Sequence, residues 1–303
     1  MRSQARLRVV WFTLSDRQGA EGFLGALREG LRDLGHQEGR DFVLEVRAAN
    51  FSAENGERIA AELIALRPAL IVAQGPAWRV MARQPPSVPV VFGFSGDPVD
   101  AGVAASMARP GRNLTGMTFM ALDLVAKRME ILKEALPRLR RVAIIANPEH
   151  PGEHRELAVS RTAAERLGLE VSYHPAKTAT ELQPALASSL EARAEALVVF
   201  PDAVTNARRG EIVAFSLKNS IPGISGWSVY ADSGLLLSYG PNLRDSWYRI
   251  ASYVDRVLKG ANPAELPIET PRSVELVVNL ITARTLGIRI PQSVLARADR
   301  VIE

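Results

Sequence analysis

The sequence predicts an α/β protein made of two lobes, each with a parallel sheet flanked by helices. Strand-like and helix-like segments alternate along the chain, and the alternation occurs twice. The chain has 303 residues, enough for two domains of about 130–150 residues, each with a core of its own. Most strand-like segments are short and apolar on both faces, as in parallel strands covered by helices on both sides.

The strand-like segments fall into two sets, each rich in Val, Ile and Leu. The first set is residues 7–13, 42–47, 70–73 and 88–92. The second set is residues 142–146, 169–174, 196–200 and 221–225. Because strands that alternate with helices form right-handed βαβ units, each set predicts one parallel sheet.

Amphipathic helices are expected between these strands. They are residues 21–34, 53–66, 122–136, 153–167, 179–192 and 205–219, followed by 246–258. Gly35 and Gly168 follow two of them as C-terminal stops, and Pro137 ends a third. The tail, residues 283–303, predicts a short helix, a break at Pro291 and a final helical turn.

Extended segments join the two sets and predict that the chain passes between the lobes three times. These segments are residues 113–118, 235–242 and 275–279, and such crossings act as hinges. They divide the chain into an N-terminal lobe of residues 1–116 plus about 242–277 and a C-terminal lobe of residues 117–241 plus about 278–303.

Composition excludes several classes of function. The net charge is only +4 without a block of like charge, which argues against a nucleic-acid partner. The absence of cysteine excludes disulfides, thiolate metal sites and a cysteine nucleophile. The sequence has no long apolar run of membrane-spanning length. The basic start has no apolar signal region, so either the protein is cytoplasmic or its export signal has been removed.

The motifs of common cofactor and catalytic sites are also missing. There is no phosphate-binding loop, no G-x-S-x-G elbow and no G-x-G-x-x-G turn. His150 and His154 have the spacing of a metal pair, but Pro151 and Gly152 between them argue against a shared helical face. We therefore expect no cofactor, no metal and no catalytic residue.

Ligands of open parallel sheets bind beyond the carboxyl ends of the strands, so the loops that follow the strands supply the candidate ligand-binding residues. In the first lobe the candidates are Leu14, Ser15, Asp16, Gln74, Gly75, Pro76, Trp78, Phe94, Ser95 and Asp97. In the second lobe they are Asn147, Glu149, Asp202, Trp227 and Tyr230.

These residue types suit a small carboxylate with an apolar or aromatic body. The carboxylate would meet backbone N–H groups and hydroxyls near Ser15, Gly75 and Ser95. The body would stack on aromatic rings of this set, which are Trp78, Phe94, Trp227 and Tyr230.

Several candidates have a purely structural alternative. Asp97, Asp202 and the pair Ser15 and Asp16 precede predicted helices and are suited to cap them. Trp78 is equally suited to pack under its own helix.

The sequence resembles the ABC transporter substrate-binding proteins that include the tryptophan-binding, TrpX-like receptors. The resemblance spans nearly the whole chain and is carried by three motifs in combination. They are GDPV at 96–99, ARPGRNLTG at 108–116 and SYGPN at 238–242. Residues 127–137 (KRMEILKEALP) and 253–267 (YVDRVLKGANPAELP) also match.

The resemblance implies a type I periplasmic-binding-protein fold, with two Rossmann-like lobes, three interlobe crossings and the ligand in the cleft between the lobes. It implies capture of a small solute, an aromatic amino acid among the known ligands, and delivery to ABC permease subunits in the membrane. A periplasmic or otherwise extracytoplasmic monomer is then expected. Trp78, where a small residue is common, and the charged loop 13–18 depart from the family habit.

Two other classes of function stay open. One is a two-domain Rossmann-like enzyme, such as a glycosyltransferase or racemase, for which Asp16 with Asp202 or Glu149 would be the catalytic pair. The other is a cytoplasmic sensor domain.

Overall fold

A computed structural model of the chain describes residues 6–17 and 20–303. The chain forms two compact units. Unit 1 comprises the residues up to Met120 together with Leu243–Pro271, and unit 2 comprises Ala121–Asn242 together with Arg272–Glu303. Gly19 and Gln18 of the glycine-rich and charged stretch after the first strand lie outside the described residues.

The sheet of unit 1 is parallel throughout its paired strands. Its strands are β1 (Leu7–Thr13), β2 (Phe42–Ala48), β3 (Leu70–Gln74), β4 (Val90–Phe94) and β5 (Leu114–Thr118). They are arranged in the order β2-β1-β3-β4-β5. Thr13, the last residue of β1, pairs with Gln74, the last residue of β3. The loops after these two strands therefore leave the sheet side by side.

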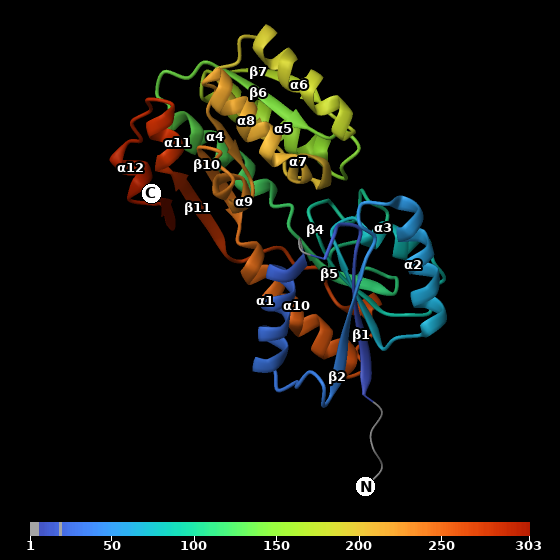
Figure 1. Cartoon of the computed structure of the whole chain (residues 1–303). Helices are drawn as coiled ribbons and strands as arrows, with labels where there is room; N and C mark the ends of the chain where they lie inside the picture. Colours follow the sequence, from blue (N-terminus) through green and yellow to red (C-terminus); the bar gives the residue numbers. More distant parts are fainter. Residues whose placement is uncertain (1–5, 18–19) are drawn as a thin grey trace. The chain divides into compact units, whose positions relative to one another are not determined.

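Helices cover both faces of this sheet because alternate residues of each strand are apolar on either side. The helices are α1 (Glu21–Asp33), α2 (Ala53–Leu66), α3 (Ala77–Ala82) and α10 (Leu243–Leu258). Val9 and Trp11 of β1 pack with α1 and α10 on one face. Val10 and Phe12 pack with α2 and α3 on the other. Figure 1 shows α1 beside α10, and α2 with α3 across the sheet.

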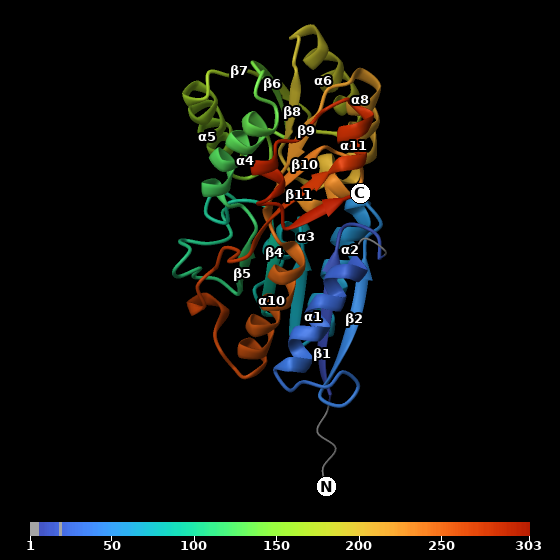
Figure 2. The same ribbon diagram turned by 90° about the vertical axis from the view of Figure 1, so that its left-hand side faces the viewer.

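The sheet of unit 2 is mainly parallel. Its strands are β6 (Arg141–Ala146), β7 (Glu170–Pro175), β8 (Ala196–Val199), β9 (Gly223–Ser225), β10 (Leu237–Pro241), β11 (Val274–Asn279) and β12 (Arg300–Ile302). Read from the β7 edge, their order is β7-β6-β8-β9-β10-β11-β12. Among the pairs of this sheet, β10 with β11 is antiparallel. Figure 2 shows β8, β9, β10 and β11 following one another across the sheet.

Helices also cover both faces of the sheet in unit 2. They are α4 (Leu122–Ala135), α5 (Glu153–Arg166), α6 (Ala179–Glu191), α7 (Ala203–Ala207), α8 (Arg209–Asn219), α9 (Ser228–Asp232), α11 (Leu280–Thr285) and α12 (Gln292–Leu295). Apolar residues of α4, α5, α11 and α12 share one core with the sheet. Residues of α6, α8 and α9 share the other.

The first strands of the two units follow the same order. The order β2-β1-β3-β4-β5 in unit 1 corresponds to β7-β6-β8-β9-β10 in unit 2. In both, the chain reverses its direction of winding next to the first strand, between β1 and β3 and between β6 and β8. In open α/β sheets, ligands bind at the carboxyl ends of the strands next to such a switch point.

The fold class expected from the sequence is confirmed, and most elements lie within two residues of their predicted bounds. The short helix, the break at Pro291 and the final helical turn expected in the tail are present as α11, Pro291 and α12. Residues 300–302, for which no strand was expected, pair with β11 as strand β12. The predicted helix 205–219 is divided at Arg208 into α7 and α8.

The extended segments predicted to cross between lobes are strands inside the units. Residues 114–118 form β5 of unit 1, whereas residues 237–241 and 274–279 form β10 and β11 of unit 2. The chain passes between units after Met120, Asn242 and Pro271, at the ends of these strands. The expected boundaries were 116, about 242 and about 277, so residues 117–120 and 272–277 lie in the opposite unit. Hydrogen bonding to a neighbouring strand fixes which unit each segment joins.

None of the described helices is both long enough and apolar enough to cross a membrane.

Candidate ligand-binding site

In unit 2, a hydrogen bond joins the loops on the two sides of the switch point. Asn147 follows β6, and its Nδ2 donates to Oδ2 of Asp202, which follows β8, over 2.7 Å. The Oδ1 of Asn147 accepts the backbone N–H of Glu149 at 3.0 Å. The amide is thereby oriented, and it holds the carboxylate at the carboxyl edge of the sheet.

Asp202 is also the N-cap of α7, in a capping box. Its Oδ1 accepts the backbone N–H of Thr205 at 2.7 Å, and Thr205 Oγ1 accepts the backbone N–H of Asp202 at 3.0 Å. The structural alternative for Asp202 is therefore present, together with the bond to Asn147. With a residue exposure of 3%, Asp202 is a buried carboxyl group whose oxygens have polar partners.

Tyr230 belongs to the core of unit 2. It is fully buried, and its hydroxyl donates to Thr205 Oγ1 over 2.9 Å. Burial, opposed in part by the bond to Thr205, raises the pKa of the Tyr230 phenol. The expectation that this ring is exposed to ligand is not met within unit 2, because α9 turns it toward the α6 and α8 side of the sheet.

The two other candidates of unit 2 are accessible. Trp227 is the N-cap of α9, directly after the loop that follows β9, and it is only partly buried. Glu149 is exposed, and its Oε1 lies 3.3 Å from Lys177 Nζ. Since β8 pairs with both β6 and β9, Asn147, Asp202 and Trp227 follow three adjacent strands.

In unit 1, the loop after β1 is fixed to the loop after β2. The carbonyl of Leu14 accepts the backbone N–H of Phe51 at 2.7 Å, and the carbonyl of Ser15 accepts that of Asn50 at 3.2 Å. Ser15 Oγ lies 2.8 Å from Thr13 Oγ1, and the Ser15 backbone N–H donates to the same oxygen at 3.2 Å. Asp16 follows in a partly buried position.

The loop after β3 is held in the same way. Gly75 has φ +56, and its backbone N–H donates to the carbonyl of Gly93 at 2.8 Å. Gln74 Oε1 accepts from Trp11 Nε1 at 3.1 Å, so a side-chain bond also joins β1 and β3 at this switch point. Pro76 is the N-cap of the short α3.

The rings of Trp78 and Phe94 form part of the core of unit 1. Both are buried, with ring centroids 5.0 Å apart, and Phe94 meets Phe92 at 5.2 Å. The packing alternative for Trp78 is the one that the structure shows. Neither ring is presented to a ligand by its own unit.

The residues after β4 form a capped turn. Asp97 Oδ1 accepts the backbone N–H groups of Val99 at 2.8 Å and Asp100 at 3.0 Å. Thr118 Oγ1 donates to the carbonyl of Gly96 at 2.6 Å, which ties this turn to β5. Ser95 is partly buried beside it. The GDPV motif therefore builds a rigid turn at the edge.

The expected carboxylate cradle needs a correction. The backbone N–H groups of Ser15 and Gly75 are used inside unit 1, so they are not available as the carboxylate donors proposed from the sequence. A hydrogen-bond donor to the ligand carboxylate has to come from other residues at the carboxyl ends of the strands.

Sequence reasoning missed two residues at these edges. Phe51, after β2, is 67% exposed and has φ +62, a left-handed conformation that is uncommon for an aromatic residue. Arg128, inside α4, is buried with its guanidinium beside Gly226, which follows β9. The FSAENGE stretch reads as a helix start and KRMEILKEALP as an ordinary amphipathic helix, so the sequence has no local signal for either.

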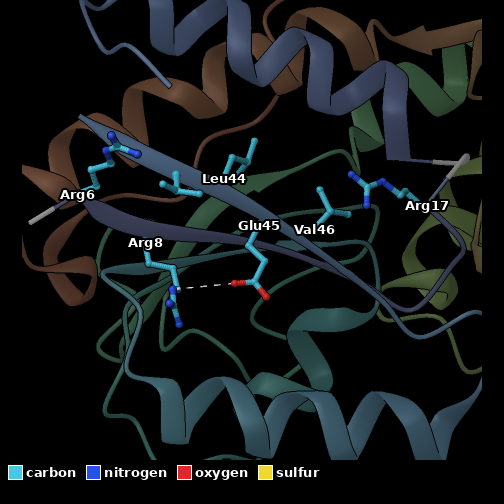
Figure 3. Close-up of a pocket in the computed structure, with 7 residues that line it drawn as sticks. Arg6, Arg8, Arg17, Leu44, Glu45 and Val46 are labelled. Carbon is cyan, nitrogen blue, oxygen red and sulfur yellow. Dashed lines mark ion pairs between the residues drawn. The ribbon is translucent and has the colours of Figure 1, made fainter. Parts of the chain in front are cut away.

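Two surface pockets lie elsewhere in the units. Figure 3 shows the pocket on β1 and β2 of unit 1, about 450 Å³ in volume. Its lining is Arg6, Arg8, Arg17, Val43, Leu44, Glu45 and Val46. Glu45 lies 4.0 Å from Arg8 Nε and 2.6 Å from Arg47 Nε, which partly neutralises the arginines.

The second pocket, about 610 Å³, lies on α11 and α12 of unit 2. Neither pocket is lined by a residue expected to bind ligand. Within residues 6–17 and 20–303, no group of three or more His, Asp or Glu side chains is arranged to hold a metal ion.

Two α/β units with matching strand order, joined by passages after Met120, Asn242 and Pro271 and with polar loops at their switch points, define a solute-binding protein of the periplasmic type. The chain belongs to the ABC transporter substrate binding protein family, whose model matches residues 16–302. It is therefore the substrate-binding component of an ABC transporter. This family membership gives no support to the alternative of a two-domain Rossmann-like enzyme.

One curated relative matches most of this chain. The tyrosine-binding protein of Clostridioides difficile (strain R20291) is 23% identical over 271 residues, which are 89% of this chain and 76% of the relative.

Solved structures confirm the fold. An ABC domain from Streptococcus pneumonia in complex with L-Trp has a TM-score of 0.90 and 20% identity, with 98% of this chain and 100% of that chain covered. A conserved domain protein from Vibrio cholerae has a TM-score of 0.89 and 22% identity, over 97% and 99% of the two chains. A ligand-free, open substrate-binding protein with adhesive properties from Clostridium difficile has a TM-score of 0.74 and 20% identity, over 98% and 99%.

Proposed function

We propose that this chain captures an aromatic L-amino acid at the carboxyl-end loops of its sheets and delivers it to an ABC permease. The relatives support an amino acid as ligand, since one is a tyrosine-binding protein and another was solved with L-Trp. The residues of this chain have the polar and aromatic groups that such a ligand needs.

The observation that carries the proposal is the Asn147–Asp202 pair beside Trp227. Asp202 Oδ2 accepts from Asn147 Nδ2 at 2.7 Å, and a carboxylate oxygen has a second lone pair for a ligand ammonium group. Trp227 follows the adjacent strand and packs against the core that contains Tyr230, but it is only partly buried, so part of its side chain is accessible to an aromatic ligand. A carboxylate that can accept from an ammonium group, followed on the adjacent strand by an aromatic ring, suits the ammonium group and the side chain of an aromatic amino acid.

Thermal unfolding with candidate ligands tests the proposal. L-Tyrosine, L-tryptophan and L-phenylalanine are compared with L-leucine, D-tryptophan and D-arabinose, since sugar-binding proteins share this fold at lower similarity. A ligand at 100 times its Kd stabilises the folded state by about 2.7 kcal/mol, which raises Tm by roughly 4 °C for a chain of this length. Stabilisation by the sugar and by no amino acid would contradict the proposal.

A variant pair connects binding to the site. Trp227→Ala is expected to weaken binding of L-tryptophan by about tenfold or more, because an aromatic contact and its buried area are lost. Tyr248→Phe is the control, since Tyr248 lies on α10 of unit 1 and its hydroxyl is bonded at 2.9 Å to Asp33, the last residue of α1, and not to a candidate loop. Calorimetric titration gives both Kd values.

We propose further that the protein acts outside the cytoplasm as a monomer without catalytic activity. The family's transport role supports this location, and the binding role needs no chemical step. Fractionation of cells that express the native gene tests the location, and light scattering with and without ligand tests the monomer. Recovery of unchanged L-tyrosine after prolonged incubation tests the absence of turnover.

A further inference from the structure

Arg128 is a buried cation in unit 2 that connects three elements. It lies inside α4 and is 4% exposed. Its Nε donates to the carbonyl of Tyr239 on β10 over 3.1 Å, and its Nη1 donates to Glu156 Oε1 on α5 over 2.9 Å. The guanidinium plane is fixed by these two bonds, so the direction of the third nitrogen, Nη2, is fixed as well.

Nη2 points at the loop after β9. A Cβ placed on Gly226 would lie 2.6 Å from Nη2 and 3.0 Å from Pro201 Cγ. Any side chain at position 226 would therefore displace the arginine. Gly226 separates Ser225, the last residue of β9, from Trp227, and Pro201 precedes Asp202. Nη2 is thus directed at the same edge as the two site residues.

A second glycine brings the loop this close. A Cβ on Gly240 would lie 1.8 Å from the carbonyl oxygen of Gly226. The backbone of β10 consequently passes close to Gly226, and the preceding residue, Tyr239, supplies the carbonyl that accepts from Arg128. The SYGPN and KRMEILKEALP segments of the sequence thus meet at one guanidinium.

The third nitrogen keeps unused hydrogen-bonding capacity. Among the described residues no hydrogen bond of Nη2 is found, while Nε and Nη1 each donate one. Nη2 is also not one of the fully buried side-chain nitrogens that lack a partner within the described residues, so an acceptor from outside the protein can reach it. Burial is the main cause that raises the pKa of Glu156, the carboxyl partner of Nη1. An unused donor on a fixed cationic group favours an added anion at Nη2.

We propose that Arg128 is a ligand-binding residue whose Nη2 donates to the carboxylate of the bound amino acid through the opening left by Gly226. The proposal rests on the proposed function. It replaces the carboxylate donors of Ser15 and Gly75 by a charged one, and it explains why glycine stands at position 226. The single available nitrogen suits one carboxylate oxygen rather than a bidentate pair.

Comparison of L-tyrosine with L-tyrosinamide tests the proposal, because the amide keeps the ring and the ammonium but has no carboxylate. The wild-type protein is expected to bind the acid about 10- to 100-fold more tightly, the range of a charge-assisted bond to a buried group. Equal Kd values for the two compounds would overturn the proposal.

The variants separate ligand binding from structural support. Arg128→Met alone would leave Glu156 buried without its partner, so the double variant R128M/E156L is used, which replaces the pair by apolar side chains. Its preference for the acid over the amide is expected to fall close to one. E156Q keeps the arginine and is expected to keep the preference. A double variant that folds and still prefers the acid overturns the proposal.

Gly226→Ala gives an answer if the double variant does not fold. Its methyl group stands against Nη2, so the affinity for L-tyrosine is expected to fall at least tenfold and that for L-tyrosinamide much less. An equal loss for both compounds overturns the proposal. If the wild-type protein binds neither compound nor any other amino acid, the proposed function itself is wrong. If it binds both compounds equally well, the proposed function stands and the role of Arg128 is wrong.

Discussion

Asn147 and Asp202 are joined by a 2.7 Å hydrogen bond across the switch point of unit 2. The bond connects the loop after β6 to the loop after β8, and Asp202 also caps α7. In unit 1, Trp11 Nε1 and Gln74 Oε1 are bonded across the corresponding pair of strands. Each unit therefore has a side-chain bond where its winding reverses, and this bond fixes the loops that a ligand would meet.

Loss of the Asp202 carboxylate should destabilise the protein. Asp202→Ala removes the cap of α7 and leaves the Asn147 amide without its acceptor, so we expect the free energy of unfolding to fall by about 1–3 kcal/mol. Asp97→Ala is the control, since Asp97 caps a turn but is partly exposed, and a loss of about 0.5–1 kcal/mol is expected. Urea unfolding measures both, and equal losses would contradict the importance of the Asn147 bond.

Tyr230→Phe tests whether the Tyr230 hydroxyl stabilises the core or contacts the ligand. The variant keeps the ring in the core and removes the hydroxyl with its bond to Thr205, so we expect the free energy of unfolding to fall by about 1 kcal/mol. The Kd for L-tryptophan should stay the same. A tenfold weaker Kd without any change in Tm would show instead that the phenol contacts ligand.

His174 makes stability depend on pH. Burial lowers the pKa of this imidazole, whose Nε2 lies 2.8 Å from Ser172 Oγ and whose Nδ1 contacts Ser188 Oγ. The unfolded chain, with an ordinary pKa of 6.5, takes up a proton first as the pH falls, so the stability present above pH 6.5 is lost below it, by up to about 1.4 kcal/mol per pH unit.

His174→Gln removes this group and keeps a polar side chain at the same position. The difference in Tm between the wild type and the variant, followed from pH 8 to pH 5, should change in favour of the variant below the ordinary histidine pKa. A difference that stays constant over this range would show that His174 does not titrate differently in the two states.

The alternation of elements could be predicted from the sequence because it depends on apolar periodicity alone. The direction of individual side chains in the loops could not. Tyr230 was placed in an irregular stretch, whereas residues 228–232 form one helical turn that directs its ring inward. Gly75 was expected to present its N–H to a ligand, but its left-handed conformation directs that group to Gly93.

Contacts between residues far apart in the chain could not be predicted from the sequence either. Arg128 is 98 residues away from Gly226 (226 − 128) and 111 from Tyr239, and nothing in an amphipathic helix marks which of its basic residues is buried. The strand β12 was missed for a related reason. Its residues 300–302 are a strand only because β11 offers an edge to pair with.

Phe51 is where stability and binding should oppose each other. Phe51 and Arg67 both have left-handed backbone conformations, with φ +62 and φ +46. A non-glycine residue there costs about 1–2 kcal/mol, and glycine removes this cost but loses entropy on folding, so F51G and R67G should each stabilise the protein by about 0.5–1 kcal/mol. Phe51 lies at the carboxyl edge of the sheet, next to Leu14 and Ser15, with 67% of its surface exposed. Arg67, in contrast, only ends α2.

If Phe51 is kept in its strained backbone conformation because its ring contacts ligand, F51G should weaken binding of L-tryptophan, while R67G should leave the Kd unchanged. Tm and Kd measured on the same two variants give the answer. Equal Kd values for F51G, R67G and the wild type would show that the edge of unit 1 near β2 takes no part in binding, and would limit the ligand contacts of that unit to the loops after β1, β3 and β4.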